Sequence, residues 1–173
     1  MEPGTVIWIT GLPGSGKTTI AQKVCDRLRA QTPAVVLVDG DIVREALGGL
    51  GYSMPDRLEN ARRISRLCQM LSRQGVHVVC ATVSLFHEIH RWNRQQLPNY
   101  LEVRVDVRWE TLQARDKKGL YSSAASGQAT DVLGVNQSVE MPMDPDIVLT
   151  NDDDVDDARM AQNVEQIVAG VIS

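Results

Sequence analysis

The segment from Gly11 to Thr18 combines residue types and a spacing that bind the phosphates of a nucleoside triphosphate. It reads Gly11-Leu12-Pro13-Gly14-Ser15-Gly16-Lys17-Thr18, the pattern G-x-x-x-x-G-K-[ST]. The glycines let backbone N–H groups surround phosphate oxygens, Lys17 can reach the β- and γ-phosphates, and the Thr18 hydroxyl can hold Mg²⁺. An apolar run, Val6–Ile9, precedes the loop and a helical pattern follows it, so the positive end of a helix points at the same place. The loop predicts triphosphate binding and leaves the reaction open.

Two carboxylates follow the second expected strand in the segment Asp39-Gly40-Asp41, with Arg44 shortly after. Ligands bind at the carboxyl ends of the strands in a doubly wound sheet, beside the phosphate loop. One carboxylate there can hold Mg²⁺ through water while the other accepts a proton from an attacking hydroxyl. The third strand ends in Thr82-Val83-Ser84, without the aspartate of many ATPases and GTPases, and no N-K-x-D motif for guanine is present. These observations favour a small-molecule kinase over a motor or a switch.

Strand-like and helix-like runs alternate along the chain, which is typical of an α/β fold with a parallel sheet. The expected strands are Thr5–Thr10, Ala34–Val38, Val76–Val83, Leu101–Val105 and Asp146–Thr150. The expected helices are Lys17–Ala30, Arg57–Arg73, Glu88–Gln96, Glu110–Arg115 and Val155–Val171. Glu102 and Arg104 interrupt the fourth strand and indicate a place nearer the sheet edge.

We therefore expect one P-loop NTPase domain over residues 1–173, of the nucleotide-kinase type: a doubly wound, parallel, five-stranded sheet with helices on both faces. The segment Ser122–Met143 is rich in Ser, Gly, Pro and Met and predicts a long mobile connection. Long loops of this kind often close over a site, so we expect a lid over about residues 115–143.

The composition limits the partners and the compartment. The 173 residues are 43% hydrophobic, enough for one sizeable core, and the net charge of −4 argues against a nucleic-acid binder. Three widely spaced cysteines in apolar contexts, Cys25, Cys68 and Cys80, predict buried free thiols in a reducing compartment. No apolar run reaches transmembrane length, and the first residues lack the basic start of a signal peptide. We expect a soluble cytoplasmic protein with no membrane partner.

Several motifs occur in order along the chain: Gly11–Thr19, Asp39–Arg44, Gly51–Ser53 with Asp56-Arg57 and Glu59-Asn60, and Arg115–Tyr121. Together they resemble the adenylyl-sulfate kinase family from Val6 to about Thr150. The resemblance implies transfer of the ATP γ-phosphate to the 3′-hydroxyl of a small nucleotide, with adenylyl sulfate giving 3′-phosphoadenylyl sulfate in sulfate assimilation. It also implies ATP and Mg²⁺ as cofactors and a homodimer.

The resemblance assigns roles position by position. Catalysis is implied for Lys17, Asp39, Asp41 and Lys118. ATP contact is implied for Gly11, Pro13, Gly14, Ser15, Gly16, Lys17, Thr18, Thr19, Arg115 and Thr150. Acceptor contact is implied for Asp41, Arg44, Tyr52, Arg57, Asn60, Val83, Ser84, Phe86, Lys118, Gly119 and Leu120. Mg²⁺ is implied at Thr18 and Asp39, partly through water. Which of Asp39 and Asp41 is the base stays open.

The departures from the family all fall on the acceptor side. Tyr52 can still stack on a base, but Val132 stands where the family's F-T-G-I-D stretch has the second aromatic of the adenine sandwich. Ser84-Leu85-Phe86 replaces S-P-Y, Ser138-Val139-Glu140 replaces P-Y-E, and Phe86 offers a partial substitute for the stacking surface. An alternative acceptor is therefore cytidine diphosphoramidate, used in capsule modification, whose base is smaller. A non-catalytic regulatory domain is a third hypothesis, which the intact ATP-side residues disfavour.

Other polar features fit structural roles better than functional ones. His87 and His90 are three residues apart rather than four, which disfavours a zinc site and indicates surface helix residues. His77 has no evident partner. The acidic run Asp152–Asp157 precedes the last helix and predicts a helix cap.

Overall fold

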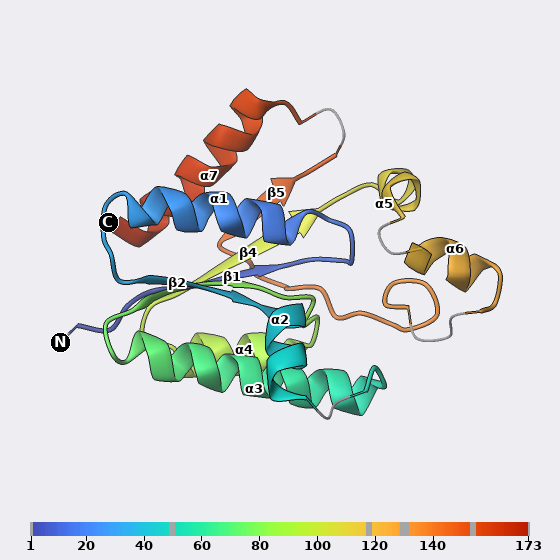
Figure 1. The fold of residues 1–173 in the computed structure, drawn as a ribbon, viewed down its shortest axis with the longest axis horizontal. Helices are drawn as coiled ribbons and strands as arrows, with labels where there is room; N and C mark the ends of the chain where they lie inside the picture. Colours follow the sequence, from blue (N-terminus) through green and yellow to red (C-terminus); the bar gives the residue numbers. More distant parts are fainter. Residues whose placement is uncertain (1, 49–50, 117–118, 129–131, 153–154, 173) are drawn as a thin grey trace.

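The computed structural model describes residues 2–48, 51–116, 119–128, 132–152 and 155–172. Five parallel strands form one sheet in the order β2-β3-β1-β4-β5 (Figure 1). The strands are β1 (Val6–Thr10), β2 (Val35–Asp39), β3 (His77–Ala81), β4 (Tyr100–Asp106) and β5 (Ile147–Thr150). Every residue of the central strand β1 is buried, which explains its continuous apolar run.

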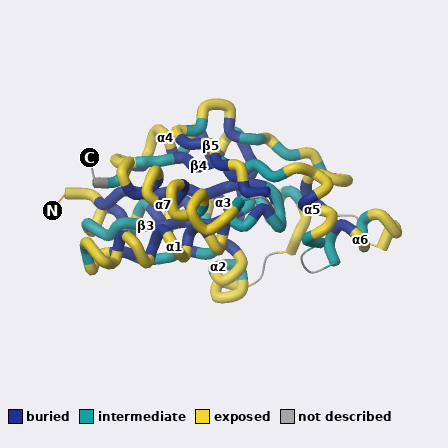
Figure 2. Tube along the Cα trace, turned by 90° about the horizontal axis from the view of Figure 1, so that it is seen from above, coloured by how far each residue is buried: buried dark blue, intermediate teal, exposed yellow. Residues whose placement is uncertain are grey.

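Helices cover both faces of this sheet (Figure 1). α1 (Lys17–Arg29) and α7 (Asp157–Ile172) lie on one face, and α3 (Met54–Ser72) and α4 (His87–Gln96) lie on the other. Successive β1 side chains point to opposite faces, so Ile7 and Ile9 join the core under α1 and α7, whereas Val6 and Trp8 join the core over α3 and α4. Figure 2 shows buried residues concentrated in the body of the molecule, whereas α6 at its end is largely exposed.

Three shorter helices lie toward the carboxyl ends of the strands. They are α2 (Gly40–Leu47), α5 (Trp109–Arg115) and α6 (Leu120–Ala125), and α5 and α6 extend beyond the body of the sheet (Figures 1 and 2). The expected sheet, its helical layers and the helix after the phosphate loop are thus confirmed.

Five expectations about the elements need correction. The prediction omitted α2, and it started α3 at Arg57, whereas the Ser53 hydroxyl caps that helix by accepting a hydrogen bond from Asp56 N. The third strand ends at Ala81, so Val83 lies in the following loop. α6 forms where the sequence predicted a mobile connection.

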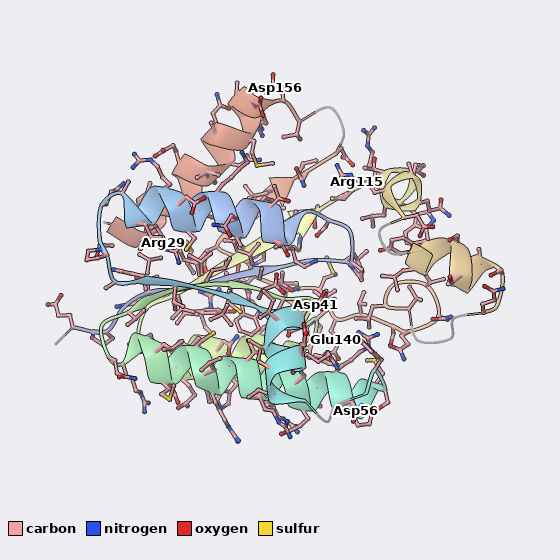
Figure 3. All side chains as sticks on the ribbon, viewed as in Figure 1. Arg29, Asp41, Asp56, Arg115, Glu140 and Asp156 are labelled. Atoms are coloured by element: carbon pink, nitrogen blue, oxygen red, sulfur yellow. The ribbon has the colours of Figure 1, made fainter. Side chains whose placement is uncertain are left out.

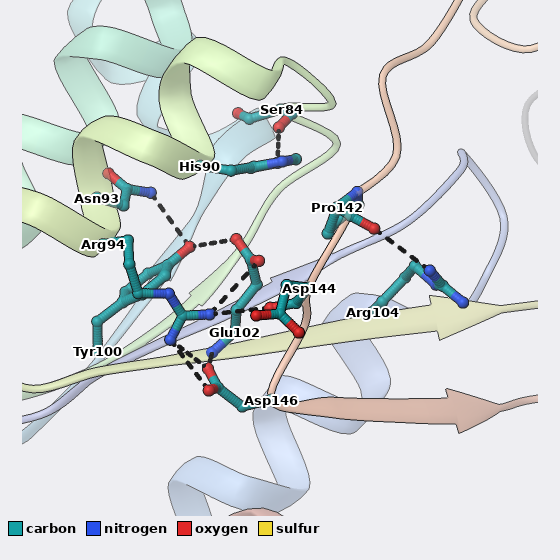
Figure 4. Close-up of polar contacts among 10 residues, drawn as sticks. All are labelled: Ser84, His90, Asn93, Arg94, Tyr100, Glu102, Arg104, Pro142, Asp144 and Asp146. Carbon is teal, nitrogen blue, oxygen red and sulfur yellow. Dashed lines mark hydrogen bonds and ion pairs between the residues drawn. The ribbon is translucent and has the colours of Figure 1, made fainter.

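The fifth correction concerns β4, which pairs with both β1 and β5 rather than lying at an edge. Glu102 is only 3% exposed there, and the Tyr100 hydroxyl donates to its Oε1 at 2.7 Å. Arg94 lies 3.7 Å from Glu102 Oε2 and binds both carboxylate oxygens of Asp146 (Figure 4). Burial raises the pKa of the Glu102 carboxyl and of the Tyr100 hydroxyl. The Glu102 side chain is tolerated inside this sheet because polar partners surround it: Arg94 from α4, and Asp146 from the segment directly before β5.

The predictions for other polar residues have mixed outcomes. His90 is buried, so its assignment to the surface is wrong. His77 has a partner, because its Nδ1 accepts a hydrogen bond from Thr5 N at 3.1 Å. Asp156 caps α7 by accepting from Arg159 N, as expected for the acidic run. All three cysteines are free and buried, as expected.

Neither a membrane span nor a clustered metal site is found in the described ranges. No helix in them has the length and apolar character needed to cross a bilayer. The same residues contain no group of three or more His, Cys, Asp or Glu side chains that could hold a metal ion.

Candidate active site

The phosphate-binding loop turns directly from β1 into α1. Gly14 and Gly16 adopt left-handed φ values of 81° and 88°, which favour glycine. A side chain at Gly16 is also excluded by space, because its Cβ would lie 2.2 Å from Asn151 Nδ2. Lys17 is only 8% exposed, and its ammonium donates to Leu12 O at 2.8 Å and to Ser15 Oγ at 3.4 Å. The loop therefore presents backbone groups and one cation at the start of a helix.

Three distant side chains hold the outside of this loop. Asn151, in the segment between β5 and α7, donates to Ser15 O at 2.8 Å. The Tyr121 hydroxyl on α6 donates to Pro13 O at 2.7 Å, and Arg115 on α5 donates to Gly14 O at 3.4 Å. The Tyr121 ring meets Trp109 edge-on at 5.2 Å, and burial raises the pKa of Tyr121 to about 12, so its hydroxyl remains a donor. Sequence reasoning gave neither Asn151 nor Tyr121 a role in supporting this loop.

The two carboxylates after β2 lie in different surroundings. Asp39 Oδ2 accepts a hydrogen bond from Thr18 Oγ1 at 2.9 Å, which joins it to the phosphate-binding loop. Asp39 Oδ1 accepts from the backbone N–H groups of Asp41 and Ile42 at 2.9 and 3.4 Å and so caps α2. Asp41 is exposed in the first turn of α2, at the same carboxyl end of the sheet as Arg115 (Figure 3). The capping role of Asp39 explains why a helix forms at once after this strand.

An exposed tyrosine between two arginines lies beyond α2. The guanidinium carbons of Arg44 and Arg57 are 4.7 and 5.3 Å from the centre of the Tyr52 ring. Arg57 Nε also donates to Tyr52 O at 2.8 Å, and Arg44 Nη1 donates to Gly51 O. The Tyr52 side chain is nevertheless 59% exposed, so its ring is held in place while remaining accessible.

A cavity of about 550 Å³ joins these groups. Its lining includes most of the predicted site residues: Pro13, Gly14, Gly16, Lys17, Thr18, Thr19, Asp39, Asp41, Arg44, Tyr52, Arg57, Asn60, Val83, Ser84, Phe86 and Leu120. Asn60 is 5% exposed, and its Oδ1 has no hydrogen-bond partner within the described ranges. Such a buried acceptor needs a donor, which a bound ligand can supply.

Some predicted site residues lie outside this lining. Gly11 and Ser15 belong to the phosphate-binding loop but are buried and do not reach the cavity surface. Arg115 contacts the loop from outside. Gly119 precedes α6, and Thr150 ends β5 with an exposed side chain; neither lines the cavity. Lys118 falls outside the described residues.

The two sides of the cavity are chemically unlike. The loop, Lys17 and the start of α1 suit phosphate, whereas the opposite side combines cationic, aromatic and apolar groups. Phe86 lines this second side and also packs into the core over α3 and α4. Val132 also lines the cavity, but it packs with Leu112 and Tyr121 beside the phosphate-binding loop. The arrangement can hold a triphosphate and a second, aromatic ligand at once.

Comparison with known proteins identifies the family. A model of adenylylsulphate kinase matches residues 3–150. The chain belongs to this family. Membership confirms a kinase that transfers a phosphoryl group to a hydroxyl acceptor, on the P-loop kinase fold predicted from the sequence.

Relatives within the adenylylsulphate kinase family carry two names. The cytidine diphosphoramidate kinase of Campylobacter jejuni is 38% identical over 146 residues, 84% of this chain and 85% of the relative. The adenylyl-sulfate kinase of Deinococcus deserti is 41% identical over 150 residues, 86% and 83% of the two chains. The structure of the Mycobacterium tuberculosis APS kinase CysC in complex with AMPPNP and APS has a TM-score of 0.87 at 31% identity and matches over the full length of both chains.

Proposed function

We propose that this protein transfers the γ-phosphate of ATP to the 3′-hydroxyl of adenylyl sulfate. The observation that carries the proposal is one cavity whose lining combines Lys17 and the phosphate-binding loop with Asp41 and Tyr52. Phosphoryl transfer needs little covalent help, so positioning and cations supply most of the catalysis.

The donor side can hold ATP with Mg²⁺. Backbone N–H groups of the loop and the Lys17 ammonium would bind the β- and γ-phosphates. The Thr18 hydroxyl and the Asp39 carboxylate, 2.9 Å apart, are hard oxygen ligands of the kind that Mg²⁺ prefers. When bound, Mg²⁺ would neutralise charge that develops on the phosphates. The segment 115–143 would act as a lid, because α5 and α6 already contact the loop through Arg115 and Tyr121.

The acceptor side can hold a nucleotide with its hydroxyl near a base. We assign the base to Asp41, because the contacts of Asp39 with Thr18 and with the start of α2 place Asp39 beside the phosphate-binding loop, whereas Asp41 is exposed one turn into α2 in the cavity lining. Tyr52 would stack on the nucleotide base, and Arg44 and Arg57 would pair with its anionic groups. The unpartnered Oδ1 of Asn60 would accept a hydrogen bond from the same ligand. Lys118, by its resemblance alone, would approach phosphate.

Cytidine diphosphoramidate is the second candidate acceptor. The observation that favours it is the aliphatic surface of Val132 and Leu133 in the cavity lining, where a second stacking aromatic is expected for adenine. Tyr52 alone suits a smaller pyrimidine base. A homologue with this activity in its name is 38% identical to the chain.

The decisive experiment measures kcat/KM for the two acceptors at the same MgATP concentration, with Lys17→Ala as the inactive control. We expect adenylyl sulfate to be the better substrate. A preference of about a hundredfold or more for cytidine diphosphoramidate would reverse the assignment, because pocket contacts set such ratios. ATP binding without acceptor-stimulated ADP release, across a wider nucleotide panel, would instead support a non-catalytic regulatory domain.

We further propose a homodimer in the cytoplasm. The family relationship supports the dimer, and light scattering of the purified protein at several concentrations tests it. A constant mass equal to that of one chain would contradict it.

A further inference from the structure

The loop between β3 and α4 forms one wall of the cavity without belonging to a helix or strand. All five of its residues, Thr82 to Phe86, line the cavity. Because the loop lacks regular backbone pairing, other contacts must fix its position relative to Asp39 and Asp41 at the start of α2.

A row of close contacts runs through this loop. A Cβ at Gly40, between Asp39 and Asp41, would lie 2.8 Å from Thr82 Oγ1, so the start of α2 rests directly on Thr82. Thr82 Oγ1 and Ser84 Oγ share a hydrogen bond of 2.8 Å. Ser84 O is in turn 2.9 Å from His90 Nε2 on α4 (Figure 4). The row connects the acidic pair to a histidine outside the cavity lining.

The chemistry of His90 suits a fixed donor. A carbonyl oxygen can only accept, so Nε2 must carry the hydrogen in this contact. The side chain is 7% exposed, and burial lowers its pKa to about 4 even though the Ser84 carbonyl opposes the shift. The imidazole is therefore neutral at physiological pH and holds its proton on Nε2. Its Nδ1 has no hydrogen-bond partner within the described ranges, so the contact with Ser84 O is what anchors the ring there.

A separate contact holds the end of the loop. Glu140 Oε2 accepts from His87 N at 2.6 Å, and Glu140 N donates to Leu85 O at 3.1 Å. Glu140 lies on the segment returning from α6, whereas His90 contacts the middle of the loop from the helix behind it. Among the hydrogen bonds of the described residues, the one from His90 is what ties Ser84 to α4.

We propose that His90 is a positioning residue for the acceptor: through Ser84 O it holds the loop Thr82–Phe86 against the start of α2, where Asp41 lies. The proposal rests on the proposed function, because it assigns this wall to the acceptor. His90 has no contact with the phosphate-binding loop among the interactions of the described residues, so its effect falls on acceptor binding and turnover and spares ATP binding.

The test compares three variants. His90→Phe keeps an aromatic ring of similar size and removes the donor. His90→Gln retains an N–H group that can reach the same carbonyl. His77→Phe is the matched control, because it removes one histidine hydrogen bond at the amino end of the sheet.

Kinetics supply the first readout, with whichever nucleotide the unmodified protein phosphorylates. For His90→Phe we expect kcat/KM for the acceptor to fall by roughly tenfold or more while KM for ATP changes by less than about twofold, as for loss of a buried hydrogen bond. His90→Gln should recover most of the loss, and His77→Phe should match the unmodified protein. The proposal would be overturned if kcat/KM fell equally for ATP and for the acceptor, or if His90→Gln recovered none of the lost activity.

Hydrogen–deuterium exchange supplies a readout that needs no acceptor. We expect His90→Phe to speed exchange in residues 82–87 and leave the loop at residues 11–18 unchanged. Unchanged exchange in residues 82–87 would contradict the positioning role even if every candidate acceptor proved inactive. Faster exchange together with an inactive unmodified protein would instead refute the proposed function and leave the loop contact standing.

Discussion

The two sides of the cavity are held in different ways. The donor side consists of backbone groups and the nearly buried Lys17, and Asn151 and Tyr121 brace it from outside. The acceptor side presents the exposed ring of Tyr52 between Arg44 and Arg57, next to the exposed first turn of α2. A phosphate site made of main chain depends on glycine geometry, so few substitutions are tolerated. A site made of exposed side chains can change its ligand at little cost to folding.

This contrast explains where the chain departs from its family. The glycines and Lys17 of the donor side are intact, whereas Val132, in the cavity lining, stands where the family resemblance implies an aromatic that stacks on the acceptor. Mutations on one side of the cavity should therefore change the kinetics of one ligand and spare those of the other.

The largest effect is expected for Lys17→Ala on the donor side. Removing a cation that stabilises charge on the transferred phosphate should lower kcat by roughly 10³-fold. Lys23→Ala, on an exposed position of the same helix, is the control and should keep normal turnover. Steady-state ADP release measures both, and circular dichroism checks the fold. Near-normal turnover by Lys17→Ala would remove this residue from the catalytic assignment.

The next effect separates the two carboxylates. Asp41→Asn removes the proposed base and should lower kcat by roughly 10²-fold or more without changing KM for ATP. Asp39→Asn keeps an oxygen that can cap α2, so it should fold normally and instead raise the Mg²⁺ concentration needed for half-maximal rate. Titrating Mg²⁺ against each variant measures the difference. If the two phenotypes are exchanged, Asp39 is the base.

A smaller effect is expected on the acceptor side from Tyr52→Ala. Loss of base stacking should raise KM for the acceptor by roughly tenfold. Tyr52→Phe keeps the ring and should stay close to the unmodified protein, and KM for ATP should stay constant in both. A rise in KM for ATP instead would place Tyr52 on the donor side and contradict the division of the cavity into two sides.

The sequence predicted best what local patterns control. An apolar run, a glycine-rich turn and a helical pattern were enough for β1, the loop and α1, because each forms from neighbouring residues. The helix α2 escaped prediction because Gly40 is its only buried residue, while Ile42 and Leu47 are exposed. Its start depends on the Asp39 cap rather than on an apolar stripe.

The contacts that sequence reasoning missed join residues far apart in the chain. Asn151 reaches Ser15, and Glu102 is buried because Arg94 and Asp146 converge beside it. No spacing rule connects such positions, since only the packing of β5 beside β4 brings them together. The candidate site could thus be listed residue by residue from its motifs, whereas the groups that support it required the fold.

The smallest effect is expected for Asp152, which follows Asn151 on the donor side. The backbone N–H of Arg108 donates to its Oδ1 at 2.8 Å and lowers the pKa of this carboxyl, and the Arg108 guanidinium adds an ion pair at 3.2 Å. A lowered folded-state pKa contributes stability that is present above the ordinary value near 3.8 and is lost as the pH falls through the folded-state value.

Asp152→Asn should therefore lower the urea midpoint at pH 7, and the gap to the unmodified protein should close under acid conditions below the ordinary value. Urea unfolding across that range measures the gap. A gap that persists in acid would assign the effect to packing around residue 152 rather than to its charge, and the brace on the donor side would then be steric.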